Sequence, residues 1–306
     1  NYGLINNLNI NLKNLNSLGK KDSNYKSSPQ IEFVSLFETN ASFPLIKEEL
    51  DYNNYLTPKI SLRFNPSDMK DNSTSSNQVD TDNIFSLNRL GLSDTFESGR
   101  SMTIGIDYKR EKINSLNKEN EKQNLNDINN FFEIKLATVI RDKKENHIST
   151  SSTLNRKNSN IFGSITNNFS NNFKLGYNFA IDNDLSTFEY NDINATLKFK
   201  NLETTFNFIE ENGEKGDSNI FENSIAYNLD ENNSLTFKTR RNRKINLTEY
   251  YDLVYEYKND CLVAGIKYKK SYYNDRDLKP TENLLFTITL FPLTTYEYAA
   301  DDLVSD

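Results

Sequence analysis

A polar and apolar alternation with a period of two residues recurs along most of the 306-residue chain. In residues 55–65, for example, the two interleaved sets are Ile60, Leu62 and Phe64, and Lys59, Ser61 and Arg63. Successive side chains of a strand point to opposite faces, so the pattern predicts strands with one apolar and one polar face. We count about 16 such stretches, most of about 9 to 12 residues, and a tilted strand needs ~9 to 11 to cross a bilayer. The sequence therefore predicts an all-β fold, an antiparallel transmembrane β-barrel of the outer-membrane type.

The connections between the predicted strands alternate in length. Short turns at 170–171, 201–202 and 230–233 alternate with longer ones at 183–189 and 212–217. In outer-membrane barrels the short turns face the periplasm and the long loops face outward. In the central part of the chain the predicted strands are 131–141, 147–155, 160–169, 172–182, 189–200, 203–212, 218–229, 234–245 and 249–258.

The amino-acid composition limits the classes of protein to which this chain can belong. Hydrophobic residues make up 36% of the chain, which is low for a packed soluble domain, while aromatic residues at 12% are too frequent for a disordered acidic chain. A large soluble β-solenoid or sandwich fits the same composition and stays open as an alternative. The net charge of -7 excludes a basic footprint for nucleic acid. No apolar window approaches the ~18 residues of a membrane helix.

We expect no enzymatic activity, no cofactor and no metal. His147 is the single histidine and lies near a predicted turn, where a surface role is the simpler interpretation. With one histidine and one cysteine, Cys261, the chain cannot build a cluster for a first-row metal. A barrel hydrolase that depends on His147 is the enzymatic alternative.

Residues 82–108 are predicted as a hairpin, with a strand at 84–89, a polar turn and a second strand at 102–108. The polar residues of this stretch include Asn88, Arg89, Gly91, Asp94, Glu97, Gly99 and Arg100. Their pattern resembles the "NR..G..D..E.G.R" segment of LptD, a family of LPS-assembly proteins of bacterial outer membranes. Thr95 stands where that family usually has a basic residue.

The C-terminal part is similar to the end of the same family. It has a Tyr-Glu-Tyr strand, an Asp260-Cys261 turn, an aromatic and basic strand, and a closing apolar strand at 284–291. In that closing strand we predict outward Leu284, Phe286, Ile288 and Leu290, and inward Thr287 and Thr289. The resemblance covers most of residues 55–293, diffusely in the middle.

The resemblance implies LPS translocation and insertion into the outer leaflet, through a lateral seam at the 284–291 strand. It also implies an outer-membrane location, an LptE-type lipoprotein plug, a periplasmic LPS-transport bridge, and a disulfide between Cys261 and an N-terminal periplasmic domain that lies outside this sequence. Residues 1–293 would be the C-terminal part of the barrel, with unpaired edges, and residues 294–306 a periplasmic tail. A general outer-membrane porin or receptor barrel is the alternative function.

A basic run lies toward the predicted external end of one strand and contains Arg240, Arg241, Arg243 and Lys244. Arginine pairs well with phosphate, so we predict that this run contacts LPS phosphates. A positive rim or lumen patch that offsets nearby carboxylates is the alternative. Tyrosines between 250 and 273 lie near predicted strand ends, as in the aromatic girdles at membrane interfaces.

Overall fold

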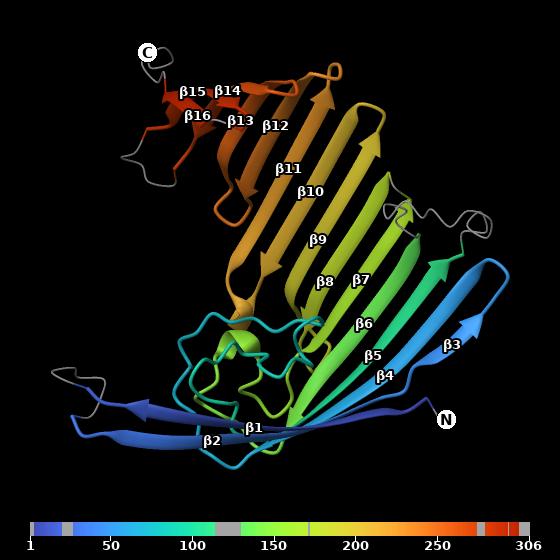
Figure 1. The fold of residues 1–306 in the computed structure, drawn as a ribbon, viewed down its shortest axis with the longest axis vertical. Helices are drawn as coiled ribbons and strands as arrows, with labels where there is room; N and C mark the ends of the chain where they lie inside the picture. The colour runs from blue at the N-terminus through green and yellow to red at the C-terminus, as the bar shows by residue number, and fades with distance from the viewer. Residues whose placement is uncertain are drawn as a thin grey trace. The chain divides into compact units, whose positions relative to one another are not determined.

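The computed structural model describes residues 3–19, 27–113, 130–170, 172–273, 279–292 and 294–299. Its strands form one 16-stranded sheet in which they follow one another in chain order, except that β3 pairs only with β4 (Figure 1). The strands are β1 (Ile5–Ser17), β2 (Gln30–Ser42), β3 (Leu45–Glu48), β4 (Tyr52–Asn65), β5 (Gly99–Lys112), β6 (Phe131–Arg141), β7 (Ile161–Ser170), β8 (Phe173–Ile181), β9 (Phe188–Phe199), β10 (Leu202–Glu211), β11 (Ser218–Asn228), β12 (Asn233–Asn242), β13 (Leu247–Lys258), β14 (Leu262–Ser271), β15 (Thr281–Leu290) and β16 (Thr294–Ala299). The prediction of an all-β antiparallel fold with about 16 strands is confirmed. No helix among the described residues is long and apolar enough to cross a membrane.

Most predicted strands agree with the observed ones to within a few residues, because the period-two pattern marks them directly. Strand β6 begins and ends where the sequence predicts, and strands β9 to β13 differ from it by at most a few residues at their ends. Two predicted strands, 84–89 and 147–155, are wrong. Two observed strands, β3 and β16, were not predicted.

The predicted strand at 84–89 lies within a non-strand connection that runs from 66 to 98, here called the 66–98 segment. Ile84 is fully buried and Leu90 is 2% exposed, and both pack into a small apolar core with Met69 and Val79 of the same segment. Apolar side chains on a folded connection give the same short apolar run as a strand, which explains the error.

The predicted strand at 147–155 is likewise part of a connection, here called the 142–160 segment, which contains the 3₁₀ turn η2 (Thr150–Ser152). Ile148 and Leu154 enter the same core as Ile84. The two segments also bond directly, since the Asn72 amide donates to the His147 carbonyl at 2.8 Å. Figure 1 shows the two segments side by side next to strands β5 to β7.

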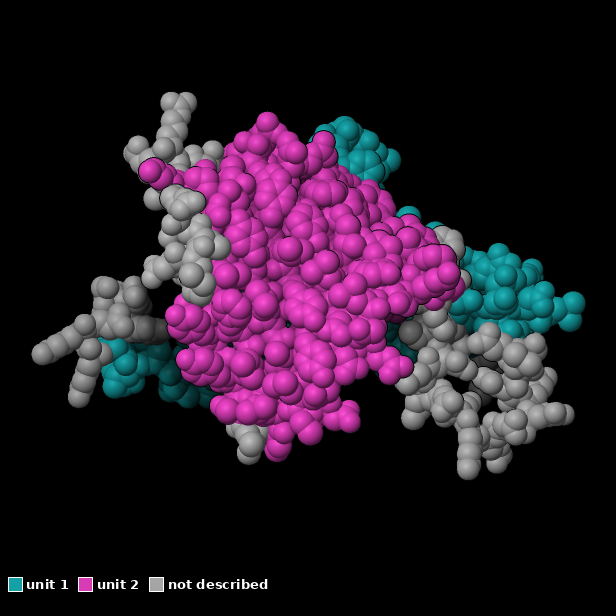
Figure 2. Space-filling view, turned by 90° about the horizontal axis from the view of Figure 1, so that it is seen from above, with its two compact units in different colours: residues 1–166, 178–190, 212–216 teal, residues 167–177, 191–211, 217–306 magenta. Residues whose placement is uncertain are grey.

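The chain divides into two compact units, coloured separately in Figure 2. Unit 1 contains residues 1–166, 178–190 and 212–216. Unit 2 contains residues 167–177, 191–211 and 217–306. Each unit is described on its own below.

In unit 1, two adjacent rows of the sheet have exposed apolar and buried polar side chains, the reverse of the pattern in a water-soluble protein. One row of directly opposed residues crosses β1, β2, β4, β5 and β6 and consists of Leu8, Thr39, Leu62, Met102 and Ile140. The next row, one residue along each strand, consists of Asn9, Glu38, Arg63, Ser101 and Arg141. Leu62 is 46% exposed, whereas its neighbour Arg63 is 5% exposed. We call the side with Leu62 the open face and the side with Arg63, against which the 66–98 segment packs, the covered face.

In unit 2, the same contrast separates an apolar face from a polar face. The apolar row across β11 to β15 consists of Ile225, Phe237, Leu253, Tyr268 and Leu284. The adjacent row on the polar face consists of Ser224, Lys238, Asp252, Lys269 and Asn283. Leu253 is 43% exposed and Asp252 is 6% exposed. Apolar side chains are thus presented to the surroundings on the face where polar ones would be expected in water.

At the C-terminal end, the predicted closing strand is followed by one more strand. The prediction of a tail at 294–306 is wrong for residues 294–299, which form β16; residues 300–306 lie outside the described residues. Tyr296 lies opposite Ile288 and Tyr298 opposite Phe286. The alternation therefore continues through residue 299 in register with the apolar face of β15.

Candidate functional site: a buried charged cluster beneath the 66–98 segment

Five charged side chains meet on the covered face of unit 1. Glu38 comes from β2, Arg63 from β4 and Arg141 from the end of β6, and all three occupy polar positions of alternating strands. Arg89 and Glu97 come from the 66–98 segment. None of the five is more than 9% exposed. We call this group the Glu97 cluster.

Glu97 is the acceptor at the centre of the cluster. Arg89 donates to it twice, from Nε to Oε2 at 2.8 Å and from Nη2 to Oε1 at 2.6 Å. Arg141 donates from Nη1 to the same Oε1 and from Nη2 to the Ser98 carbonyl. Arg63 Nη1 lies 4.0 Å from Oε2. One carboxylate therefore joins the segment to two strands.

Glu38 holds the other side of the cluster. Arg63 donates to Glu38 Oε1 from Nε at 3.0 Å and from Nη2 at 2.7 Å. The same Nη2 donates to the Ser86 carbonyl of the 66–98 segment at 2.5 Å. Asn9 of β1 donates to Glu38 Oε2 at 3.0 Å. Strands β1, β2 and β4 are thereby tied to the segment through one guanidinium.

The charges of the cluster explain the protonation state of Glu97. Three arginines and two glutamates give a formal balance of 3 − 2 = +1. Burial raises the pKa of Glu97, but the positive charges of Arg89, Arg141 and Arg63 outweigh it and lower this pKa to about 2. Glu97 is therefore an anion at neutral pH, and its charge is needed to balance the buried arginines.

Other contacts fix the 66–98 segment at two further places. Lys13 of β1 donates from Nζ to the carbonyls of Leu92, Ser93 and Thr95, at 3.2, 3.2 and 2.9 Å. At the other side Phe85 lies on Gly105 of β5, where a Cβ would come within 2.8 Å of the ring. The segment is thus held by charge, by hydrogen bonds and by close packing.

The 142–160 segment has an ionic anchor of its own. Arg156 Nη2 lies 3.3 Å from Glu189 Oε1 and 2.9 Å from Glu214 Oε2. Asn160 donates to the second oxygen of Glu189 at 2.7 Å. These bonds join the segment to β9 and to the 3₁₀ turn η3 (Gly213–Lys215).

The seven residues that carry the LptD resemblance are close in the fold, but they have different roles. Arg89 and Glu97 form the ion pair of the cluster. Asn88 accepts from the Leu92 amide at 2.7 Å, and Asp94 pairs with Lys70 at 2.9 Å. The two glycines, Gly91 and Gly99, have φ of 65° and 77°, which disfavours other residues. Residues 88–99 therefore fold as a polar connection clamped to the sheet.

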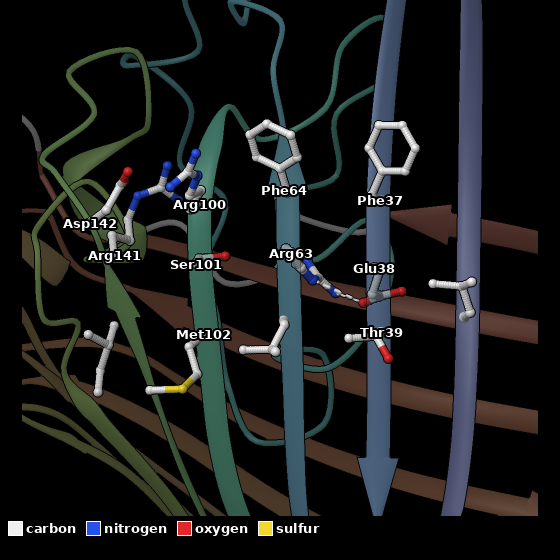
Figure 3. A pocket seen from close by; sticks show the side chains of 13 residues that line it. Phe37, Glu38, Thr39, Arg63, Phe64, Arg100, Ser101, Met102, Arg141 and Asp142 are labelled. Atoms are coloured by element: carbon white, nitrogen blue, oxygen red, sulfur yellow. Dashed lines mark hydrogen bonds and ion pairs between the residues drawn. The ribbon is translucent and has the colours of Figure 1, made fainter.

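Arg100 is the one residue of this set that faces the other way. It lies opposite Phe64 in the register of β4 and β5, on the open face, with its guanidinium carbon 5.3 Å from the centre of the Phe64 ring. A groove of about 510 Å³ runs beside it (Figure 3).

The residues of the predicted gate strand lie on β15 and alternate between its two faces. Leu284, Phe286, Ile288 and Leu290 lie opposite Tyr268, Ile266, Ala264 and Leu262 on one face, and Thr287 and Thr289 lie opposite Gly265 and Val263 on the other. Cys261 is exposed in the turn between β13 and β14, where its amide donates to Asn259 Oδ1 at 3.0 Å. Its predicted disulfide partner and the seam stay predictions.

In the predicted basic run, two of the cations have nearby carboxylates. Arg240 lies 3.3 Å from Glu222 and 2.7 Å from Glu249, and Lys244 pairs with Asp217. Arg241 and Arg243 line a surface hollow with Phe221 and Asn246. Arg240 and Lys244 thus fit the positive rim offset by carboxylates, while a phosphate contact of Arg241 and Arg243 stays a prediction.

His147 lies 54% exposed, with Nδ1 2.9 Å from Glu145 Oε1. Ser98 donates to the other oxygen of that carboxylate at 2.5 Å. The glutamate therefore stands between the serine and the histidine, so His147 does not contact the hydroxyl as a general base would. Within the described ranges, no group of three or more His, Cys, Asp or Glu side chains could hold a metal ion.

Sequence reasoning missed Glu38, Arg63 and Arg141 as members of a site. The sequence did contain a signal for them, because each is a charged residue at a polar position inside an alternating strand. What the sequence does not reveal is that a connection packs over them and removes them from water.

No protein-family model and no curated protein matches the chain. Among solved structures, it is similar to a triple mutant of the Rhodopseudomonas blastica porin, with TM-score 0.36, 9% identity, and coverage of 96% of this chain and 93% of the porin. Two further mutants of the Rh. blastica porin give TM-scores of 0.37 and 0.35 at 9% and 10% identity, covering 96% of this chain and 93% and 98% of theirs. These TM-scores lie below the range in which two chains share a fold, so the similarity supports no functional inference.

Proposed function

We propose that this chain is an outer-membrane β-barrel protein of the general porin or receptor type, whose polar face lines a hydrated path. The observation that carries the proposal is the reversed polarity of the sheet. Exposed Leu62 and Leu253 alternate with buried Arg63 and Asp252. Water disfavours this arrangement, whereas hydrocarbon outside and water inside favour it.

The length of the apolar stretch fits a bilayer. On the open face of β5, Arg100 and Arg110 enclose the outward residues Met102, Ile104, Ile106 and Tyr108. Ten residues at about 3.3 Å each span about 33 Å along the strand. A tilt of about 45° reduces this to about 23 Å along the membrane normal, close to the ~25 Å apolar band of such barrels. The two arginines then lie at the two headgroup levels.

Aromatic side chains support the same placement in unit 2. Tyr251 stacks on Phe237, with ring centres 6.1 Å apart, and meets Tyr272 edge-on at 6.0 Å. Tyr255 lies further along the same face, opposite Ile266. Leu253 lies between these tyrosines. The rings around Tyr251 suit one interface of a membrane, because Tyr255 lies only four residues, about 13 Å, further along β13.

The 66–98 segment should narrow the proposed hydrated path. Because the Glu97 cluster clamps the segment onto the covered face of unit 1, solutes on that face meet a filled surface rather than an open lumen. We therefore expect the purified protein to form channels of low conductance in a planar bilayer. Loosening the clamp with Glu97→Gln should give larger conductance steps. A protein that gives no conductance with or without the substitution would contradict a porin role.

LPS translocation is the second candidate function, with an LptE-type plug and a periplasmic bridge as partners. The observation in its favour is that the residues of the resemblance pattern form one connected structure at 88–99. Its test is a photo-crosslinking residue at Thr287, Thr289 or Leu290 of the full-length gene product. An LPS adduct that depends on upstream transport would favour this function, and a folded protein with no adduct would favour the porin.

A further inference from the structure

The open face of unit 1 has a groove with two exposed charges of opposite sign at one end. The row at this end consists of Phe37, Phe64, Arg100 and Asp142, and the next row consists of apolar side chains together with Thr39. Figure 3 shows Phe37, Phe64, Arg100 and Asp142 together at one end and Met102 and Thr39 further along the strands. The groove measures about 510 Å³, within the usual size of small-molecule sites.

The two charges are available to a ligand. Arg100 and Asp142 are both exposed, at the end of β5 and β6 nearest the 66–98 and 142–160 segments. In the described part of the chain neither forms an ion pair, either with the other or with a third residue; the Asp142 amide meets the Arg100 carbonyl at 3.4 Å. The Arg100 guanidinium lies instead over the Phe64 ring. A fixed cation beside a fixed anion is complementary to a headgroup that carries both signs.

We propose that this groove binds a membrane lipid whose headgroup carries a phosphate and a primary ammonium, of the phosphatidylethanolamine class. Arg100 holds the phosphate, since a guanidinium donates two parallel hydrogen bonds to it. Asp142 accepts from the ammonium. Leu62, Met102 and Ile140 contact the first part of an acyl chain. The inference rests on the proposed membrane location.

The placement of Arg100 agrees with such a ligand. By the length argument for β5, Arg100 lies at a headgroup level, where long cationic side chains reach lipid phosphates. Arg110 lies at the other level of the same strand and face, over the Tyr52 ring at 4.0 Å, but it does not line the groove. Arg110 is therefore a matched control for a generic arginine at the interface.

The test uses the purified full chain, reconstituted with equal amounts of phosphatidylethanolamine, phosphatidylglycerol and phosphatidylcholine. Native mass spectrometry then counts the lipids that stay bound. We expect retention of phosphatidylethanolamine over phosphatidylcholine by about tenfold, the effect of one charge-assisted bond. Asp142→Asn should remove this preference, because the quaternary ammonium of phosphatidylcholine has no N–H to donate to the carboxylate, and it should also abolish the preference for phosphatidylethanolamine over phosphatidylglycerol. Arg100→Gln should lower the retention of all three lipids, since each carries the phosphate, and Arg100→Lys should restore part of it. Arg110→Gln should change neither the preferences nor the retention.

Any other outcome of this test contradicts a specific part of the lipid-binding proposal. Equal losses in Arg100→Gln and Arg110→Gln would show a generic interfacial effect and no site. If the protein prefers phosphatidylglycerol and Asp142→Asn leaves that preference unchanged, then Asp142 takes no part in binding and the ligand is not zwitterionic. A wild type that inserts but retains the three lipids equally would reject the groove while leaving the proposed function intact. A wild type that fails to insert would overturn both.

Discussion

Arg89 and Glu97 form a two-bond ion pair, at 2.8 and 2.6 Å, inside the connection between β4 and β5. Their side chains are 1% and 7% exposed, and both partners also reach strand residues, Thr103 and Arg141. The pair therefore fixes the fold of the connection and its position on the sheet together.

Removing the charge of Glu97 should release the 66–98 segment. Glu97→Gln leaves three buried arginines with one carboxylate, and breaking a buried pair costs about 3–5 kcal/mol. We expect rapid cleavage within 66–98 in limited proteolysis, while strands β10 to β15 stay protected. Asp94→Asn is the control, because the Asp94–Lys70 pair is nearly half exposed and is worth at most about 1 kcal/mol. Equal protection of both variants would contradict a structural role for the cluster.

The ion pairs of Glu97 that hold the 66–98 segment on the sheet should weaken as the pH falls. The pKa of Glu97 is lowered from 4.5 to about 2 in the folded chain. Its contribution, about 3 kcal/mol by linkage, is fully present above pH about 4.5 and is lost as the pH falls to about 2. Hydrogen exchange of residues 84–98 should be flat between pH 5 and 8 after correction for the intrinsic rate, and protection should fall below pH about 4. Loss of protection near pH 6 would point to another group.

Glycine makes a close ring contact possible at another point in unit 1. A Cβ at Gly163 would overlap the ring of Phe179, which packs edge-on against Phe188 at 5.9 Å. Gly163→Ala should therefore lower the free energy of unfolding by about 1–3 kcal/mol. Gly176→Ala, whose Cβ would meet nothing closer than 4.0 Å, should be close to neutral. Equal effects in urea unfolding would show that the Phe179 ring moves aside freely.

The exposed thiol offers a test of sidedness. Cys261 lies in the turn between β13 and β14, whereas the 243–246 turn lies at the opposite ends of neighbouring strands. A membrane-impermeant maleimide should label Cys261 from one side of the membrane and a cysteine placed at Asn246 from the other. Labelling of both from the same side would contradict a spanning sheet.

The sequence predicts the strands well, since alternation is a local property of each stretch. Ile60, Leu62 and Phe64 mark β4 without knowledge of its neighbours. It fails at Ile84 and Ile148, because a short apolar run looks the same whether a sheet or a folded connection buries it. Apart from the Arg89–Glu97 pair, the Glu97 cluster joins residues 25 to 44 positions apart, such as Glu38 with Arg63 and Glu97 with Arg141. One sequence shows that these positions are polar, but not which of them meet.

The most direct test of the central claim is an arginine placed on each face of unit 2. Leu253 lies on the apolar face and Thr236 on the polar face, one row away. In folding from urea into lipid vesicles, Leu253→Arg should lower stability by about 2–4 kcal/mol, and Thr236→Arg by less than about 1. If Leu253 faced water, arginine in its place would change stability by only about 0.5 kcal/mol. That result, with the protein folding equally well in buffer without lipid, would contradict the membrane assignment.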